Sequence, residues 1–520
     1  MPTIRTYTTA LRNYLSQPPF KILYTICGII LLFAAAESSA HTVKNSASIY
    51  QDVLVRFSPG TLNTNSLPKY LVVAEGSSEK INVEKISDNW ARVKSSNNRS
   101  SLRIMKSLNE DPNVDFIQPN YAIHLPEDYR IQDPIRRAAF MRGLGKMDDP
   151  TPTDNPPIPE APIQQTGPDP LFQNQWGMLD LGVRDGWKVT HGDPNMVVAV
   201  IDTGVDYTHE DLVANMWRNP GETGLDSQGH RKENNGIDDD GNGFIDDVVG
   251  WDFASNDNKP YDLTTPWQQL LKGEGNPGHG THCAGNIAAR GDNAVGIAGV
   301  APNVKIMAVR FITEKGQGTT ADAVKAVKYA VDNGAKVLSN SWGSEGEDPN
   351  DGAENKALRD VIIYAQDHGI LFVAAAGNGH QGAGYDNDSD AKPSYPATYG
   401  FENIISVAAI DKNDQLGGFS NWGAKSVHLG APGVAVFSSM VGNKYSDKVI
   451  DIAGFEVDWD GTSMATPHVA GAAALYWSAH PTQTWKEVKS AVISSAKKIH
   501  ALSGKTVSEG KLDVKELMKH

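Results

Sequence analysis

The sequence is poor in cysteine, with two among 520 residues, Cys27 and Cys283. Cys27 falls inside an N-terminal apolar run that is predicted to be removed. The remaining chain then has one thiol and no internal disulfide. Its stability must come from the size of its core or from bound metal ions.

The chain also lacks an excess of positive charge. It has 47 basic against 62 acidic residues, a formal net charge of -15. Nucleic acids and anionic membranes are bound through basic patches, so neither is an expected partner. The hydrophobic content of 40% and charged content of 21% are those of a globular protein. A length of 520 residues is enough for two domains.

The apolar run at 22–36 is shorter than a membrane span normally requires. Basic residues precede it, and Ser38-Ser39-Ala40 follows with the small side chains of a cleavage site. This pattern predicts a signal peptide over 1–40 and export to a secreted, periplasmic or extracellular location, without stable membrane association after processing. The alternative is an uncleaved anchor, because the basic region is long.

Residues 49–125 are predicted to form a small α+β domain. The apolar patterns at 53–57, 70–73 and 90–93 indicate strands, and the spacing at 102–108 indicates a helix.

The next segment, 126–168, is rich in proline and poor in strand-forming residues. It is predicted to be an exposed linker that contains the maturation site, since such segments are where proteolysis concentrates.

From residue 169 to the end, apolar runs alternate with helical patterns. The runs are typical of strands buried on both faces and lie at 196–201, 304–309, 337–341, 371–376 and 404–409. The helical patterns lie at 319–333, 355–369 and 462–480. We therefore expect an α/β fold with a parallel sheet and helices on both faces over 169–520.

Three short motifs lie at strand ends or helix starts of this region. Asp202-Thr203-Gly204 follows the run at 196–201, at the strand end where sites of open α/β sheets form. The same tripeptide occurs in aspartic proteases, but their chemistry needs two such carboxylates and no second copy is present.

The second motif is Gly278-His279-Gly280-Thr281-His282-Cys283. Its histidines are three apart without the glutamate of the usual zinc helix, so His282 is expected to be structural. Cys283 could be a nucleophile, but a buried structural thiol is preferred because the chain offers a better nucleophile.

The third motif, residues 461–471, opens a helix with Gly461-Thr462-Ser463. Ser463 alone could simply cap that helix. Together with the other motifs it supplies a nucleophile for the base His279 and the orienting acid Asp202.

The three motifs, in this order, resemble the signature blocks of the subtilase family of serine endopeptidases. The resemblance implies peptide-bond hydrolysis through an acyl-enzyme by Asp202, His279 and Ser463, on protein and peptide substrates. It also implies that Asn378 completes an oxyanion hole and that Ser341, Trp342 and Gly343 form a substrate-binding strand. Trp342 stands where many relatives have a smaller aliphatic residue, so the rim of the non-primed substrate subsites is expected to differ.

Residues 49–125 resemble subtilase propeptides of the inhibitor type, notably in Asp111-Pro112-Asn113-Val114 and Gln118-Pro119-Asn120-Tyr121. The resemblance implies a zymogen that is inhibited by its own propeptide and cut near Gly167. A monomer is expected.

Calcium is expected as a structural cofactor, with two candidate sites. By resemblance to thermitase-like members, Asp169, Asp211 and Asn293 would bind one ion. An insertion places Asp238, Asp240 and Asn242 at alternate positions, with Asp246 beyond, in the manner of an EF-hand loop. A solvated acidic loop is the alternative for the insertion.

A different class of function remains possible: an exported calcium-binding scaffold on an inactive peptidase fold. A zymogen that needs an external activator is a further alternative. Neither is favoured by the motifs, since all three catalytic residue types and Asn378 are present.

Overall fold

The computed structural model describes residues 52–62, 70–73, 77–95, 108–125, 156–159, 166–271, 275–344, 355–380, 382–452 and 455–520. The signal peptide expected at 1–40 lies outside these residues, as do most of the helix expected at 102–108 and most of the linker. The chain divides into two compact units: residues 1–85 with 89–120, and residues 86–88 with 121–520.

The first unit is built on a five-stranded antiparallel sheet of order β2-β3-β4-β1-β5. Its strands are β1 (Asp52–Phe57), β2 (Tyr70–Val73), β3 (Ser77–Lys85), β4 (Trp90–Ser95) and β5 (Val114–Pro119). Val53, Val55 and Phe57 of β1 point to one face and pack with Ile81 and Val93 in a small core. The strands predicted at 53–57, 70–73 and 90–93 are thus confirmed.

The second unit contains a nine-stranded sheet of order β19-β20-β14-β13-β12-β11-β7-β9-β8. Its members are β7 (Val197–Asp202), β8 (Gly250–Asp252), β9 (Lys305–Arg310), β11 (Val337–Asn340), β12 (Leu371–Ala375), β13 (Ile404–Ile410), β14 (Leu429–Pro432), β19 (Lys497–Lys498) and β20 (Gly510–Lys511). All neighbouring strands from β20 to β8 are parallel, and β19 is antiparallel to β20. The five apolar runs correspond to β7, β9, β11, β12 and β13.

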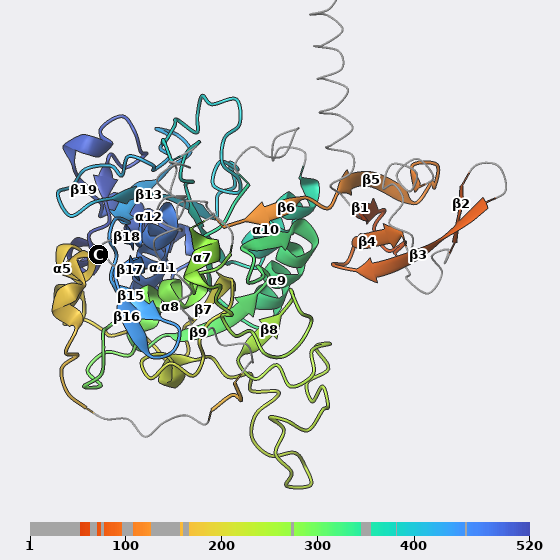
Figure 1. The fold of residues 1–520 in the computed structure, drawn as a ribbon, viewed down its shortest axis with the longest axis horizontal. Helices are drawn as coiled ribbons and strands as arrows, with labels where there is room; N and C mark the ends of the chain where they lie inside the picture. The colour runs from red at the N-terminus through yellow and green to blue at the C-terminus, as the bar shows by residue number, and fades with distance from the viewer. Residues whose placement is uncertain are drawn as a thin grey trace, which may run out of the picture. The chain divides into compact units, whose positions relative to one another are not determined.

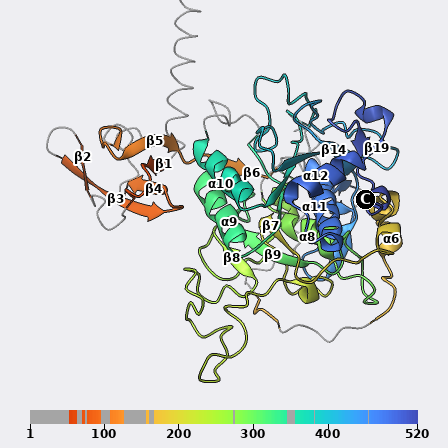
Figure 2. The same cartoon turned by 180° about the vertical axis from the view of Figure 1, so that it is seen from behind.

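Helices cover both faces of this sheet, as Figures 1 and 2 show from opposite sides. The helices are α5 (Trp176–Asp180), α6 (Val183–Gly186), α7 (Trp267–Leu270), α8 (His279–Ala288), α9 (Thr320–Asp332), α10 (Lys356–Asp367), α11 (Thr462–Ala479), α12 (Trp485–Ser494) and α13 (Val514–Leu517). Helices α8 and α11 pack on each other on one side, and α9 and α10 on the other. The predicted α/β fold is confirmed.

Three two-stranded ribbons complete the second unit. They pair β6 (Ala122–His124) with β10 (Gln317–Thr319), β15 (Ser438–Met440) with β16 (Lys444–Ser446), and β17 (Lys448–Ile452) with β18 (Phe455–Asp458). Among the residues described, no helix is both long and apolar enough to cross a bilayer.

Helix α11 is the central helix because it is buried along almost its whole length. A helix that is apolar on all sides must lie inside the protein. It packs against α8 and against β11, β12, β13 and β14, so its first turn is held at a fixed place beside the carboxyl ends of the strands.

We predict that Ile405→Ala in β13 lowers the free energy of unfolding by about 2–5 kcal/mol, because it leaves a cavity in this core. The side chain of Ile405 is fully buried, whereas that of Ile363 on α10 is 37% exposed. Denaturant unfolding in a Ser463→Ala background, which prevents self-digestion, measures both. An Ile405→Ala loss no larger than that of Ile363→Ala would contradict this account of the core.

Candidate active site

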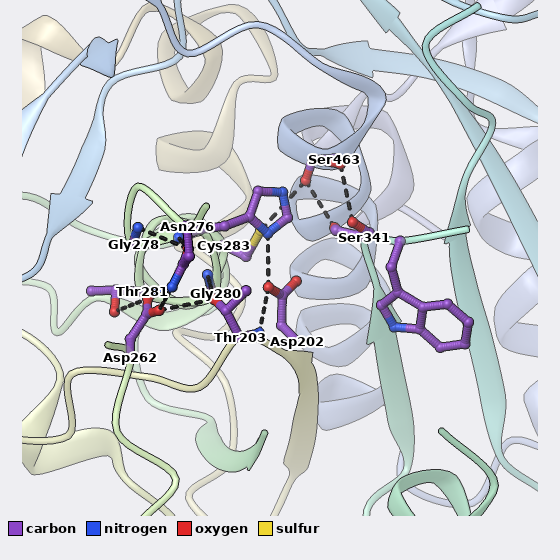
Figure 3. A network of polar contacts seen from close by, with 12 residues as sticks. Asp202, Thr203, Asp262, Asn276, Gly278, Gly280, Thr281, Cys283, Ser341 and Ser463 are labelled. Carbon is purple, nitrogen blue, oxygen red and sulfur yellow. Dashed lines mark hydrogen bonds and ion pairs between the residues drawn. The ribbon is translucent and has the colours of Figure 1, made fainter. Parts of the chain in front are cut away.

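The three predicted catalytic residues come from three elements and meet at one edge of the sheet. Asp202 ends β7, His279 begins α8, and Ser463 lies in the first turn of α11. All three are at most 2% exposed. Figure 3 shows Asp202, Cys283, Ser341 and Ser463 gathered at this place.

Asp202 and His279 are joined directly. The Nδ1 of His279 lies 2.8 Å from Oδ1 of Asp202, which also accepts the backbone N–H of Thr203 at 2.7 Å. Burial is the largest single influence and would lower the pKa of His279, but the charge and hydrogen bond of Asp202, together with the neighbouring Cys283, outweigh it and raise that pKa well above its ordinary value. The carboxylate therefore orients the imidazole and stabilises its protonated form.

Ser463 lies beside this pair without a hydrogen bond to it. Its hydroxyl donates to the carbonyl of Ser341 at 3.1 Å, and the Ser341 hydroxyl donates to the carbonyl of Ser463 at 2.9 Å. The Nε2 of His279 is buried and has no hydrogen-bond partner. A catalytic serine–histidine contact is often open in a substrate-free structure.

Behind the histidine, the buried carboxylate of Asp262 binds the segments that carry the site (Figure 3). It accepts the hydroxyl of Thr203 at 2.9 Å, the amide of Asn276 at 2.6 Å, and both N–H and hydroxyl of Thr281 at 2.8 and 2.6 Å. Asn276 in turn accepts the N–H of His279 through Oδ1 at 3.0 Å. This network fixes the start of α8 against the end of β7.

Glycine allows α8 to approach β7 this closely. A Cβ on Gly280 would lie 2.1 Å from the carbonyl oxygen of Gly204 and 3.2 Å from Cβ of Asp202. The sequence His-Gly-Thr therefore brings the imidazole onto the carboxylate by removing a side chain at the contact.

Asn378 follows β12 and is held by the same turn that carries the serine. Its Oδ1 accepts the N–H and the hydroxyl of Thr462, at 2.9 and 2.8 Å. The donor end of the amide, Nδ2, is therefore the end turned away from Thr462.

The segment 341–343 continues from β11 and borders the serine. The side chain of Trp342 is buried, with 1% of it exposed. Its Nε1 donates to the carbonyl of Ile201 at 2.8 Å, and its ring packs edge-on against Phe311. Its large side chain fits beneath the strand.

A strand of this chain lies along that segment. In β6, Ala122, Ile123 and His124 pair antiparallel with β10 in the order Thr319, Gly318 and Gln317. The N–H of His124 also donates to the carbonyl of Gly343 at 3.4 Å. Residues 121–125 thus lie in an extended conformation between β10 and Gly343, within the second unit.

Two other residues of the histidine motif are buried. Cys283 is a free thiol with Sγ 4.0 Å from Nδ1 of His279, and burial raises its pKa, which disfavours the reactive thiolate. His282 bonds the carbonyl of Val436 at 2.9 Å, and burial lowers its pKa to about 3. His282 is therefore neutral and structural, as expected.

The first predicted calcium set is assembled around one loop. Asn293 donates through Nδ2 to Oδ1 of Asp211 at 2.7 Å, and its N–H donates to Oδ1 of Asp169 at 3.2 Å. Burial raises the pKa of Asp211 to about 7. Neither carboxylate forms an ion pair with a described basic side chain.

The second predicted set is divided by the structure. Asp238 accepts the N–H groups of Gly241, Asn242 and Gly243, at 2.8, 3.1 and 2.9 Å. Asp246 accepts the N–H groups of Asn235 and Gly236, at 3.0 Å each. Asp240, 2.9 Å from the N–H of Asn242, instead gathers with Glu222 and Asp247.

Sequence reasoning missed four of these residues: Asp262, Asn276, Glu222 and Asp247. Asp262 lies 17 residues before His279 without a recognisable motif. Glu222 precedes the alternating acidic run and shares no spacing with it.

The parallel α/β sheet, with an aspartate, a histidine and a helix-borne serine at one edge, defines a serine hydrolase of the peptidase class. Comparison with known proteins narrows the class. Residues 193–512 match the Subtilase family, Peptidase S8, and the chain belongs to this family.

Two relatives illustrate the similarity. The chain is 32% identical over 397 residues to the thermophilic serine proteinase of Bacillus sp. strain AK1, covering 76% of this chain and 71% of the relative. It is 33% identical over 332 residues to thermitase of Thermoactinomyces vulgaris, covering 64% of this chain and 91% of the relative. The chain is a serine endopeptidase that hydrolyses peptide bonds of protein substrates.

We predict that Asp202→Asn lowers kcat by about 10⁴-fold, because the neutral amide no longer orients the base. Catalysis needs neutral His279, so activity is lost as pH falls through its pKa. Removing the charge of Asp202 lowers that pKa and moves the acid limb of kcat/KM to lower pH. A pH–rate profile measures both effects, with Asp367→Asn on the exposed end of α10 as the control. An unmoved acid limb would contradict the assignment of Asp202.

Proposed function

We propose that the chain is an exported subtilisin-like zymogen in which Ser463 attacks the scissile carbonyl and forms an acyl-enzyme. His279 takes the serine proton through Nε2 and returns it to the leaving amine, while Asp202 orients the imidazole. The observation that carries this proposal is the buried 2.8 Å contact between Asp202 and His279, with Nε2 unpartnered beside Ser463. The Ser463 hydroxyl turns from Ser341 to His279 when substrate is bound.

Asn378 is proposed to donate from Nδ2 to the developing oxyanion, beside the backbone N–H of Ser463. The two hydrogen bonds from Thr462 to Oδ1 support this role because they fix the orientation of the amide. One preorganised donor of this kind contributes about 2.7–4 kcal/mol to lowering the barrier.

Substrate is proposed to bind as an extended strand between β10 and the segment Ser341, Trp342 and Gly343. Main-chain hydrogen bonds supply affinity in such strand addition, and side-chain pockets supply selectivity. The pairing of β6 with β10 and with Gly343 supports this path, because it shows that an extended segment fits there.

The same strand supports the proposal that residues 49–125 are an inhibitory propeptide. Residues 121–125 are held at both ends by main-chain bonds to the segment 316–320: Leu125 N–H to Gly316 at 3.0 Å, and Thr320 N–H to the carbonyl of Tyr121 at 2.9 Å. A substrate following the proposed path would have to displace them. Export through a signal peptide at 1–40 and maturation near Gly167 complete this proposal.

A calcium ion is proposed to bind at Asp169, Asp211 and Asn293. The donor chemistry fits, since the carboxylates of Asp169 and Asp211 are hard oxygen ligands that both bond Asn293, and Asp211 is fully buried. The Asn293 amide would turn to offer its Oδ1, which accepts the N–H of Val295 at 2.9 Å. The ion would offset the burial of two carboxylates and hold loop 290–297 against the N-terminal segment, where Gly167 N–H donates to the carbonyl of Asp292 at 3.0 Å.

The test of function compares purified precursor with a Ser463→Ala variant, both in calcium, by mass spectrometry and casein cleavage over time. We expect only the parent to shorten, within 126–168, and its caseinolytic activity to rise as it shortens. The absence of both activity and reaction with a serine-directed phosphonate would overturn the peptidase assignment. Full activity of the uncut parent would overturn only the zymogen proposal.

We predict that Asp211→Asn reduces the calcium-dependent increase in Tm of the Ser463→Ala protein. An ion that binds only the folded state stabilises it by about 2.7 kcal/mol when the free ion concentration is one hundred times Kd. Thermal unfolding with calcium and with chelator measures it, and Asp367→Asn should retain the full increase. An unchanged calcium effect in Asp211→Asn would contradict this site.

A further inference from the structure

The insertion between Asn219 and Val249 brings together three carboxylates that are far apart in its sequence. Glu222, Asp240 and Asp247 each place an oxygen within 4.8 Å of the others. Two oxygens bound to one calcium ion at 2.3–2.6 Å lie at most about 5 Å apart. The spacing therefore fits a single shared cation.

The burial of this cluster is unusual for like charges. Glu222 and Asp247 are completely buried, and only Asp240 is exposed. Oε1 of Glu222 accepts the N–H groups of Asp239 and Asp240, at 2.6 and 3.3 Å, but its Oε2 is buried without any hydrogen-bond partner. A buried, unpartnered carboxylate oxygen is costly unless a cation or a proton satisfies it.

No positive side chain performs that task within the part of the chain that is described. None of the lysine, arginine or histidine ion pairs there involves Glu222, Asp240 or Asp247. The nearby Lys232 directs its ammonium group to the carbonyl of Gly221 at 2.9 Å.

The carboxylates are held in place by neutral donors. Nδ2 of Asn219 donates to Asp240 at 2.9 Å and to Asp247 at 2.7 Å, and the hydroxyl of Tyr329 donates to Oδ2 of Asp247 at 2.6 Å. A Cβ on Gly221 would lie 2.3 Å from Oδ2 of Asp240, so the backbone at 221 passes directly against this ligand. These contacts preorganise the cluster without neutralising it.

We propose that Glu222, Asp240 and Asp247 bind one divalent cation, with calcium as the ion that this chemistry favours. All three ligand atoms are hard carboxylate oxygens, which suit calcium, whereas zinc and copper prefer nitrogen and sulfur ligands. Calcium accepts the irregular geometry of loop ligands, whereas magnesium requires a near-octahedral site. Asp238 and Asp246 support the loop by accepting backbone N–H groups.

The bound ion links the insertion to the substrate-binding side of the fold. Tyr329 lies on α9, and α9 begins directly after β10, with Thr319 as its N-cap. A bound ion therefore stabilises the packing of the insertion against α9, the helix that follows β10.

The test uses the full chain with Ser463→Ala, stripped with chelator, so that binding is measured without peptidase activity. Isothermal titration with calcium is compared for the parent, Glu222→Gln and Glu233→Gln. Glu233 lies in the same insertion but outside the cluster, where it accepts the N–H of Gly224 at 3.1 Å. We expect Glu222→Gln to bind one equivalent less, or at least tenfold more weakly, and Glu233→Gln to match the parent.

Asp240→Asn, at the exposed ligand, gives a second variant that does not depend on buried packing. It is expected to weaken the same binding step while unfolding at the parent's Tm in chelator. Unchanged stoichiometry and affinity in Glu222→Gln and Asp240→Asn would overturn the proposal. A higher Tm of Glu222→Gln in chelator, with calcium binding unchanged, would assign a proton to Oε2 instead. These results are independent of whether Ser463 is the nucleophile.

Discussion

The buried carboxylate of Asp262 is the group on which the geometry of the active site depends. It has no cation beside it in the described part of the chain, and four neutral donors from three segments stabilise its charge. Burying a charge is costly unless it is hydrogen-bonded, so these donors are held tightly. The end of β7 and the start of α8 are consequently fixed to one another, and the contact between Asp202 and His279 follows.

Much of the fold could be predicted because a parallel sheet buries both faces of its strands. The runs that became β7, β12 and β13 are apolar at nearly every position. Strands such as β8 and β20 are three and two residues long and could not be recognised. Their strand character comes from neighbours distant in sequence, which no local pattern encodes.

The same distinction applies to the site. Asp202, His279 and Ser463 lie in short motifs whose residue types already indicate their chemistry. Asp262 acts through segments that the fold brings to it. The inward direction of the Trp342 side chain could not be predicted, because it depends on the residues that the fold places beneath the segment 341–343.

The acidic insertion shows how local spacing can mislead. Alternate acidic residues suggested a loop that wraps an ion by itself, yet Asp238 accepts the backbone N–H groups of its own turn. Glu222 meets Asp240 because its Oε1 accepts the N–H groups of Asp239 and Asp240, and Asn219 brings Asp240 and Asp247 together. Convergence of this kind is a tertiary property and cannot be read from intervals along the chain.

The linker is anchored at its far end as well as at β6. Tyr207 donates its hydroxyl to the carbonyl of Pro156 at 2.8 Å, and Arg218 bonds the carbonyl of Pro159. The proposed inhibitory strand is joined covalently to the rest of the peptidase unit through the linker at 126–168, in which the proposed cut near Gly167 lies. A tether of this kind holds a ligand at an effective concentration of roughly millimolar. Once the tether is cut, the high effective concentration is lost. Occupancy of the path between β10 and Gly343 then depends on the total protein concentration. If the chain is exported and cut as proposed, dilution would then complete the release of the strand.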